Sequence, residues 1–275
     1  MLQPEGTVEQ IRTIEGRRAK RARRASDPEY LDDELKDGAV FAPLYTASVI
    51  DEVLGVLKSG KEATVYLARG GAKAEEDLLA IKVYKPSQHR SFKNAAVYND
   101  GRYIGDDRVE RAMRKKTGFG HEASQFMWVG REYARLVELH GAGVAVPKPY
   151  TTTGAAIVMQ YLGDEDGCAP RLRDVALDVE TARSVWRWLW YDIEMMLGSF
   201  VVHGDLSPYN VLWWQDRAWL IDFPQAVDPR KNRSARMLLD RDIANCAKYF
   251  QRAGVDIDPQ REAIDLWRRY MRAEL

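Results

Sequence analysis

The chain has 275 residues, 45% of them hydrophobic and 30% charged, and its 41 Lys and Arg residues balance 41 Asp and Glu residues. This composition fits a globular protein with a sizeable core, and the lack of net charge argues against nucleic acid or a membrane as the main partner. The two cysteines form no CxxC or Cys/His motif and no apolar run approaches the roughly 20 residues of a membrane span, so we expect no disulfide scaffold, no zinc motif and a cytoplasmic protein.

The first forty residues differ in character from the rest of the chain. Arg17–Arg24 carries six basic side chains, and Asp27–Asp37 carries six acidic ones. Such blocks of like charge are typical of a solvated, partly disordered arm, and the alternative interpretation is contact with RNA or another polyanion. We therefore treat residues 1–44 as a charged N-terminal arm and leave both interpretations open.

Strand patterns begin directly after this arm. The segment VLGVLKSGKEATVYLAR (Val53–Arg69) predicts strand, tight turn and strand, and LLAIKVYK (Leu78–Lys85) predicts a third strand. Pro86–His121 is polar, basic and poorly periodic, which is typical of a long mobile insertion. From Ser124 to His140 the apolar residues recur at helical spacing, so a helix follows the insertion.

The second half of the chain reads mainly as helix. AAIVMQYLG predicts a strand ending at Gly163, and Asp178 can cap a helix that runs to about Leu197. A loop between short strands, Phe200–Val202 before it and Val211–Trp213 after it, precedes two helices near 241–252 and 259–272. The predicted fold is α+β and bilobal within residues 45–275, with a small β-rich N-lobe (about 45–158), a mostly helical C-lobe (about 163–275) and a nucleotide in the cleft between them.

The motif HGDLSPYN carries the strongest chemical signal. Asp205 and Asn210 stand five residues apart in a loop flanked by apolar segments. At kinase-like sites this spacing lets the carboxylate receive the proton of a substrate hydroxyl while the amide oxygen reaches a magnesium ion. Asp222, in LIDF twelve residues after Asn210, is a carboxylate at the end of an apolar strand, where pairing or a metal ion offsets its cost. Asn210 and Asp222 together predict an oxygen-rich magnesium site, with Asp205 as the catalytic residue.

Lys82 is the predicted phosphate-binding cation. In AIKVYK it shares one strand face with Ala80 and Tyr84, and a lysine on a mainly apolar strand requires an anionic partner such as the α- and β-phosphates of a nucleotide. Glu132, on the predicted helix 124–140, can pair with Lys82, although Glu122 and Glu138 compete for this role.

The turn between the first two strands lies where a phosphate-covering loop belongs. Its small residues permit close approach of the backbone, and Ser59 and Lys61 supply hydrogen-bond donors. The turn matches neither the Walker A pattern nor the GxGxxG of ordinary kinases. By itself it is weak support for a nucleotide site.

Five motifs in order resemble the RIO family of atypical serine/threonine protein kinases, in its compact form without a winged helix. They are SGKEATVY, AIKVYK, HGDLSPYN, LIDFPQAV and LLDRDIANCAKYF, and the resemblance covers roughly residues 45–253. It implies an ATP- and Mg²⁺-dependent transferase, with Mn²⁺ as an alternative metal ion, that phosphorylates an unidentified protein and itself. It further implies a structural role for Asp242, and it matches 90–121 to the flexible loop of the family.

The resemblance also implies the nucleotide-binding residues. Ser59, Gly60, Lys61, Glu62 and Lys82 would contact phosphates, with Glu132 holding Lys82. The hinge for adenine would be Met159, Gln160, Tyr161 and Leu162, and the apolar walls would be Val65, Ala80, Leu212 and Ile221. Asp222 is followed by Phe-Pro-Gln instead of Phe-Gly, and no Ala-Pro-Glu segment follows it. We therefore expect the standard peptide-docking surface to be missing.

Two alternatives remain open beside a protein kinase. HGDLxxxN also occurs in small-molecule phosphotransferases of the aminoglycoside and choline type, although SGKEA and IDFPQ count against them. An ATPase switch that assembles complexes such as ribosomal particles, through an acyl-phosphate on Asp222, is the other, and the basic segment Arg17–Arg24 would be its RNA contact. A pseudoenzyme is disfavoured because every expected catalytic side chain is present.

Overall fold

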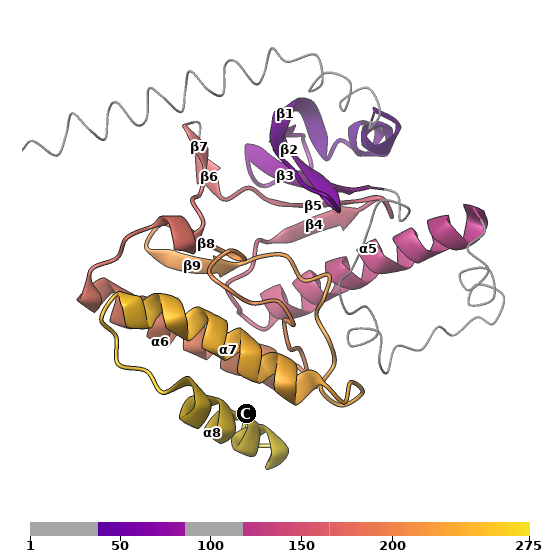
Figure 1. Ribbon diagram of the computed structural model, residues 1–275. Helices are drawn as coiled ribbons and strands as arrows, with labels where there is room; N and C mark the ends of the chain where they lie inside the picture. Colours follow the sequence, from indigo (N-terminus) through magenta and orange to yellow (C-terminus); the bar gives the residue numbers. More distant parts are fainter. Residues whose placement is uncertain (1–37, 86–117, 165) are drawn as a thin grey trace, which may run out of the picture.

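The computed structural model describes residues 38–85, 118–164 and 166–275 (Figure 1). The basic segment Arg17–Arg24, most of the predicted N-terminal arm and most of the predicted insertion lie outside the described residues. In the part that is described, no helix combines the length and apolar character needed to cross a membrane.

A five-stranded antiparallel sheet forms the N-lobe. Its strands are β1 (Ile50–Ser59), β2 (Ala63–Gly70), β3 (Leu78–Tyr84), β4 (Pro149–Thr152) and β5 (Ala156–Gln160), in the order β1-β2-β3-β5-β4. The first three strands agree with the predicted ones, whereas β4 was not predicted and β5 ends at Gln160, before the expected glycine. Residues 38–46 are helical, and Phe41 from this turn meets the ring of Tyr66 edge-on at 5.0 Å. The central position of β3 places Lys82 in the middle of the sheet.

Helix α5 (Gly118–Gly141) crosses below the sheet (Figure 1). It contains the predicted helix 124–140 but begins earlier, so the prediction that the insertion extends to His121 is wrong for residues 118–121. Glycines at 118 and 120 and the polar sequence there gave no apolar period. The buried side chains Val129, Glu132, Leu136 and Leu139 lie three or four residues apart, which turns one face of the helix toward the sheet and the C-lobe.

The C-lobe is mostly helical. Its elements are the hairpin β6 (Gly163–Asp164) and β7 (Gly167–Cys168), the 3₁₀ turn η2 (Leu172–Asp174), α6 (Val179–Gly198), the hairpin β8 (Val211–Trp214) and β9 (Arg217–Leu220), α7 (Ala235–Arg252) and α8 (Pro259–Met271). Asp178 caps α6 as predicted, and its carboxylate accepts hydrogen bonds from the backbone N–H groups of Glu180 and Thr181.

Three expectations for this lobe need correction. Phe200–Val202 is not a strand, because only Val202 forms a bridge, to Val227. Helix α7 begins at Ala235, six residues before the predicted start near Arg241, since its first turns include the buried Leu238 and Leu239. The β6–β7 hairpin was not predicted, because two-residue strands leave no periodic pattern.

Two apolar cores support this arrangement. One lies within the N-lobe, around Tyr66, Leu79 and Ile81. The other joins Ala63 and Tyr84 of the sheet, the buried face of α5 and the interior of the C-lobe. This larger core holds the ends of β2 and β3, α5 and the hairpin β8–β9 together, so the cleft between the lobes has a continuous apolar support.

Candidate active site

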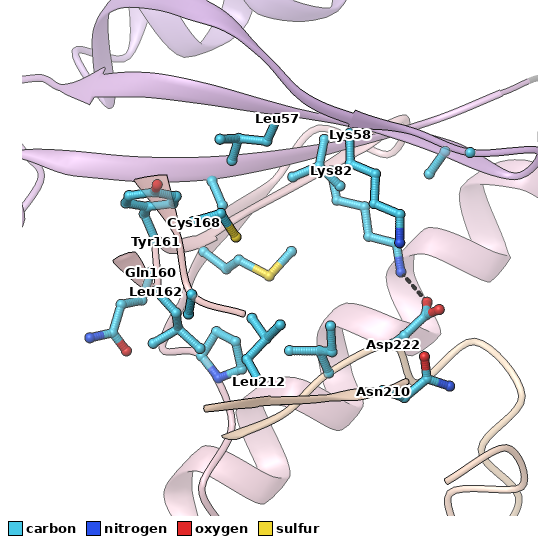
Figure 2. Close-up of a pocket in the computed structure, with 18 of the residues that line it drawn as sticks. Leu57, Lys58, Lys82, Gln160, Tyr161, Leu162, Cys168, Asn210, Leu212 and Asp222 are labelled. Atoms are coloured by element: carbon cyan, nitrogen blue, oxygen red, sulfur yellow. Dashed lines mark hydrogen bonds and ion pairs between the residues drawn. The ribbon is translucent and has the colours of Figure 1, made fainter. Parts of the chain in front are cut away.

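A pocket of about 510 Å³ lies between the sheet and the β8–β9 hairpin (Figure 2). Its walls come from β1, β2, β3, α5, the segment after β5, β7 and the region from Asn210 to Asp222. Of the predicted site residues, the following line it: Gly60, Lys61, Glu62, Val65, Ala80, Lys82, Glu132, Met159, Gln160, Tyr161, Leu162, Asn210, Leu212, Ile221 and Asp222.

Two predicted site residues do not line the pocket, Ser59 and Asp205. The Ser59 hydroxyl lies 3.3 Å from the Thr64 hydroxyl and accepts a hydrogen bond from Lys85 Nζ at 3.1 Å. Asp205 is exposed beside the pocket and contacts Asn210, which does line it.

Lys82 is held by two carboxylates. Its Nζ lies 2.8 Å from Glu132 Oε1 and 2.7 Å from Asp222 Oδ1, and its side chain is 13% exposed. Burial disfavours the charge on this amine, but Asp222 and then Glu132 outweigh that effect and hold the pKa of Lys82 well above its usual value. Lys82 therefore stays cationic in the pocket. In the described part of the chain Glu138 pairs with Arg135 instead, and the side chain of Glu122 lies outside the description.

Glu132 also contacts a side chain to which the sequence assigned no role. The Tyr84 hydroxyl donates to Glu132 Oε2, so each carboxylate oxygen of Glu132 has its own donor. Burial, followed by the Glu132 charge, raises the pKa of Tyr84 well above its usual value. The alternation of side chains along β3 was the available signal, because it already placed Tyr84 on the face of Lys82.

Asp222 follows β9 in an uncommon backbone conformation. Its φ of 73° lies in the left-handed region, where a residue other than glycine is strained. This conformation aims the carboxylate at Lys82 while leaving the side chain 46% exposed. Burial acts against the charge of Asp222, but the nearby ammonium of Lys82 dominates and lowers the pKa of this carboxyl. Asp222 is thus an ionised and accessible oxygen donor.

Asn210 is hydrogen-bonded to Asp205 and lies near Asp222 (Figure 2). Its Nδ2 donates to the backbone oxygen of Asp205 at 2.8 Å and to Asp205 Oδ2 at 3.3 Å. Figure 2 shows the amide oxygen of Asn210 turned toward the carboxylate of Asp222. One amide therefore positions a carboxylate through its nitrogen and offers an oxygen to the pocket.

The loop that carries Asp205 is fixed from below by α7. Asp242, which is 2% exposed, accepts hydrogen bonds from the backbone N–H groups of Gly204 at 2.7 Å and Leu206 at 3.1 Å. Arg241 donates to the carbonyl oxygen of Gly204. Burial raises the pKa of Asp242 to about 7 although both N–H groups favour its charge. These contacts give Asp242 the position at the loop that the family resemblance implied.

His203 fastens the same loop to the strand that leads to Asp222. Its Nε2 lies 3.1 Å from the carbonyl oxygen of Ile221, and its Nδ1 accepts from the N–H of Asp205 at 3.3 Å. Burial lowers the pKa of His203 to about 4, so the ring is neutral with its proton on Nε2.

The pocket also has apolar walls. Val65 and Ala80 of the sheet, Leu212 and Ile221 of the C-lobe, and Met159 line it. Lys58 and Ala63, from the turn predicted to cover the phosphates, also line the pocket. The pocket further includes residues that the sequence did not single out for it: Leu57, Tyr84, Leu136, Pro147, Cys168, Ala169 and Arg171. Cys168 and Ala169 enter it because the short β6–β7 hairpin pairs Cys168 with Gly163 and bonds Ala169 N–H to the carbonyl oxygen of Leu162, so both lie beside the segment after β5. Figure 2 shows Cys168 beside Tyr161.

Comparison with known proteins places the chain in a family. A family model described as the RIO domain matches residues 64–263, which is more than half of the chain. The chain belongs to the RIO family. It is 32% identical over 233 residues to the RIO-type serine/threonine-protein kinase Rio1 of Haloferax volcanii, across 83% of this chain and 74% of that protein. It is 30% identical over 251 residues to the serine/threonine-protein kinase RIO1 of Caenorhabditis elegans, across 89% of this chain.

The chain spans only 46% of the length of that nematode relative and 41% of the human serine/threonine-protein kinase RIO3. Among solved structures, the Rio2 kinase of Chaetomium thermophilum in an ADP/Mg²⁺-phosphoaspartate complex superposes with a TM-score of 0.56, at 20% identity, over 79% of this chain and 60% of that one. The predicted RIO membership and the bilobal kinase-like fold are confirmed, and the predicted enzyme class agrees with the names of these relatives, which are RIO-type serine/threonine-protein kinases.

Proposed function

We propose that this RIO protein transfers the γ-phosphate of ATP to serine or threonine hydroxyls of a protein, including its own, with Mg²⁺ bound by Asn210 and Asp222. The observation that carries the proposal is one pocket in which the Lys82–Glu132 pair of the N-lobe faces Asn210 and Asp222 of the C-lobe. Phosphoryl transfer needs positioning and neutralisation of charge more than covalent chemistry by the protein, and these residues supply both.

The donor set fits magnesium. Asn210 and Asp222 present an amide oxygen and an ionised carboxylate to the same part of the pocket, and hard oxygen ligands are those that Mg²⁺ prefers. The ammonium of Lys82 lies 2.7 Å from Asp222 Oδ1, and this contact with a positive charge supports the proposal that Asp222 can bind a cation. When bound, Mg²⁺ would neutralise phosphate charge. Mn²⁺, with similar ligand preferences, is the alternative ion.

Asp205 would receive the proton of the attacking hydroxyl. Its carboxylate is exposed at the mouth of the pocket and held by Asn210, so a protein substrate can approach it from solvent. Desolvation raises the pKa of Asp205, and the Arg241 charge and the Asn210 hydrogen bond act in the opposite direction. A raised pKa makes the carboxylate a better proton acceptor.

Adenine would lie between the apolar walls Val65, Ala80, Leu212 and Ile221, with Met159–Leu162 as the hinge segment. Lys82, fixed by Glu132, would then contact the α- and β-phosphates. Gly60, Lys61 and Glu62 would cover the phosphates, and the bond from Gly60 N–H to Ala63 O at 2.9 Å keeps this turn tight. Ser59 would join them only by leaving its hydroxyl contacts with Thr64 and Lys85.

The test is incubation of the purified chain with γ-labelled ATP and Mg²⁺, beside Asp205→Ala and Asp222→Asn variants. We expect acid-stable label on the wild-type protein and a loss of orders of magnitude in both variants. Wild-type protein that binds ATP but transfers no label to any protein would overturn the proposal and favour the small-molecule phosphotransferase. The relatives reported above are named protein kinases, which favours protein hydroxyls over small alcohols.

A second candidate is an ATPase switch. The solved Rio2 relative is described as a phosphoaspartate complex, and Asp222 here is ionised, accessible and part of the pocket wall. In this reaction a carboxylate oxygen of Asp222 would attack the γ-phosphorus, ADP would leave, and water would release phosphate from the acyl-phosphate. Acid-labile, hydroxylamine-sensitive label with release of phosphate would support this alternative, and acid-stable label alone would exclude it as the main activity.

We further propose that the charged arm, residues 1–44, precedes a kinase domain of residues 45–275 and binds RNA or a ribosomal particle through Arg17–Arg24. The six basic side chains of that segment support this proposal. Deletion of residues 1–37, which leaves the buried Phe41 and Leu44 of the N-lobe core in place, should weaken RNA or particle binding and spare ATP turnover, and unchanged binding would remove the support. The expected cytoplasmic location stays a prediction.

A further inference from the structure

We propose that Tyr84 is a positioning residue for phosphoryl transfer: its hydroxyl fixes Glu132 so that Glu132 holds Lys82 against the phosphates. The inference rests on the proposed kinase function and assigns a role to a side chain outside the predicted Lys82–Glu132 pair. It starts from the hydrogen bonds of Glu132, which divide its two carboxylate oxygens between two donors. Lys82 Nζ lies 2.8 Å from Oε1, and the Tyr84 hydroxyl donates to Oε2.

Burial makes this second donor necessary. The side chain of Glu132 is 2% exposed, so water cannot satisfy an oxygen that loses its partner. An ionised, buried carboxylate with one unpaired oxygen is costly, and rotation of the side chain toward another donor would relieve that cost. Such a rotation would move Oε1 away from Lys82. The tyrosine therefore controls the orientation of the glutamate and, through it, the place of the ammonium.

The backbone around Tyr84 is fixed well enough for this task. Tyr84 pairs with Ala63 of β2 in the sheet, and its N–H donates to the carbonyl oxygen of Ala155 at 2.9 Å. The ring is 4% exposed and belongs to the core that joins the sheet, α5 and the C-lobe. Since Tyr84 follows Lys82 by two residues on β3, both side chains leave the same face, and Lys82 Nζ lies 5.2 Å from the ring centre of Tyr84.

The charge on Glu132 keeps the hydroxyl a donor. Burial and the neighbouring carboxylate raise the pKa of Tyr84, so the phenol stays protonated at physiological pH. Lys82 and Tyr84 thus each donate one hydrogen bond to the carboxylate of Glu132, and the three groups form a chain. Removal of the phenol oxygen alone leaves the ring in the core and deletes one link of this chain.

The experiment compares Tyr84→Phe with Tyr133→Phe. The control changes the neighbour of Glu132 on α5, whose hydroxyl donates to the backbone oxygen of Tyr150 at 3.2 Å. We expect Tyr84→Phe to lower kcat for autophosphorylation about tenfold with less than a threefold change in the Kd for Mg·ATP, whereas Tyr133→Phe stays within twofold of wild type in both. Equal rates for the two variants would overturn the proposal.

A double-mutant cycle separates positioning from general damage. In a Glu132→Gln background, Tyr84→Phe should cause no further loss of rate, because the group through which it acts is already altered. A further tenfold loss would show that the phenol acts independently of Glu132 and would overturn the proposal.

A second readout does not depend on phosphotransfer. An acyl-phosphate derivative of ATP acylates a lysine amine placed beside the phosphates, and mass spectrometry gives the labelling rate at Lys82. We expect this rate to fall at least fivefold in Tyr84→Phe and to be unchanged in Tyr133→Phe. Wild-type protein that labels at Lys82 but transfers no phosphate would contradict the kinase proposal alone. Equal Lys82 labelling in wild type and Tyr84→Phe would contradict the role of Tyr84 alone.

Discussion

The two walls of the pocket hold their charges in different ways. On the N-lobe side, Lys82 and Glu132 are 13% and 2% exposed, and Tyr84 completes the hydrogen bonds of the carboxylate. On the C-lobe side, Asp222 is 46% exposed and Asp205 lies at the surface, with one amide between them. On the N-lobe side the charged groups find their hydrogen-bond partners within the protein. The C-lobe side instead presents oxygen atoms that could bind a metal ion and a substrate hydroxyl.

This difference predicts which substitutions change the folding free energy and which change only the activity. A buried charge network carries folding free energy as well as function, because removal of one member leaves another charge unpaired in the interior. Exposed oxygens contribute little to folding, since water replaces any lost partner. Substitutions in the N-lobe wall should therefore reduce both stability and turnover, whereas substitution of the exposed Asp205 on the C-lobe side should reduce turnover alone.

The largest expected effect lies in the exposed wall. Asp205→Asn should lower kcat for protein phosphorylation about a thousandfold, because the amide cannot accept the hydroxyl proton. The Kd for ATP should stay within threefold of wild type, since Asp205 does not line the pocket. Steady-state kinetics and calorimetric titration measure the two quantities. An Asp205→Asn variant that keeps a tenth of the wild-type kcat would show that Asp205 is not the proton acceptor.

The next effect belongs to the buried wall and appears in stability. Lys82→Met should destabilise the fold by roughly 3 kcal/mol, because Glu132 remains buried without its ammonium partner. The double variant Lys82→Met/Glu132→Gln should recover most of this free energy but none of the activity. Urea unfolding measures the difference. A Lys82→Met variant as stable as wild type would show that the two walls do not differ in this respect.

The pH dependence of stability tests His203, whose ring is hydrogen-bonded to the loop that carries Asp205. The pKa of His203 is about 4 in the fold, below the ordinary 6.5, so the unfolded chain binds more protons between these values. Stability from this group is complete above about pH 6.5 and is lost as the pH falls toward 4, by roughly 3 kcal/mol at most. His203→Gln should remove this part of the pH dependence.

Urea unfolding at pH 7, 5.5 and 4.5 compares the slopes of wild type and His203→Gln. The variant isolates His203 from Asp242, whose raised pKa acts with the opposite sign and favours folding at low pH. Parallel slopes for the two proteins would mean that the histidine is not held neutral.

The smallest effect is a control outside both walls. Ile257, 6% exposed in the segment between α7 and α8, packs in the large core. Ile257→Val should cost about 1 kcal/mol of unfolding free energy and leave kcat unchanged. Thermal unfolding and the labelled-ATP assay measure the two. A proportional loss of activity would show that turnover follows global stability, and the contrast between the walls would then lose its meaning.

Local patterns were sufficient for much of the fold. Alternation along β3 gave the strand and the face of Lys82, and Asp178 gave the start of α6. The early start of α5 was not predicted because the sequence there has no periodic apolar pattern. The β6–β7 hairpin was not predicted because its two-residue strands are too short to show one. The spacing of Asp205, Asn210 and Asp222 placed them near one another because short loops and the β8–β9 hairpin join them.

The contacts that depend on packing between distant elements could not be obtained in the same way. The selection of Glu132 among three glutamates depends on the rotation of α5 about its axis, which the whole core determines. The bond from Tyr84 to Glu132 joins residues 48 positions apart in the sequence. Asp222 has a left-handed φ, and its carboxylate accepts a hydrogen bond from Lys82, 140 positions away in the sequence.

The measurement closest to the central claim is the affinity for ATP with and without Mg²⁺, in wild type and in Asp222→Asn. If a metal ion and a nucleotide complete the exposed wall, Mg²⁺ should tighten ATP binding to wild type at least tenfold, and Asp222→Asn should lose that gain while it binds metal-free ATP as wild type does. An Asp222→Asn variant that keeps the full gain from Mg²⁺, or a wild type that shows none, would contradict the account.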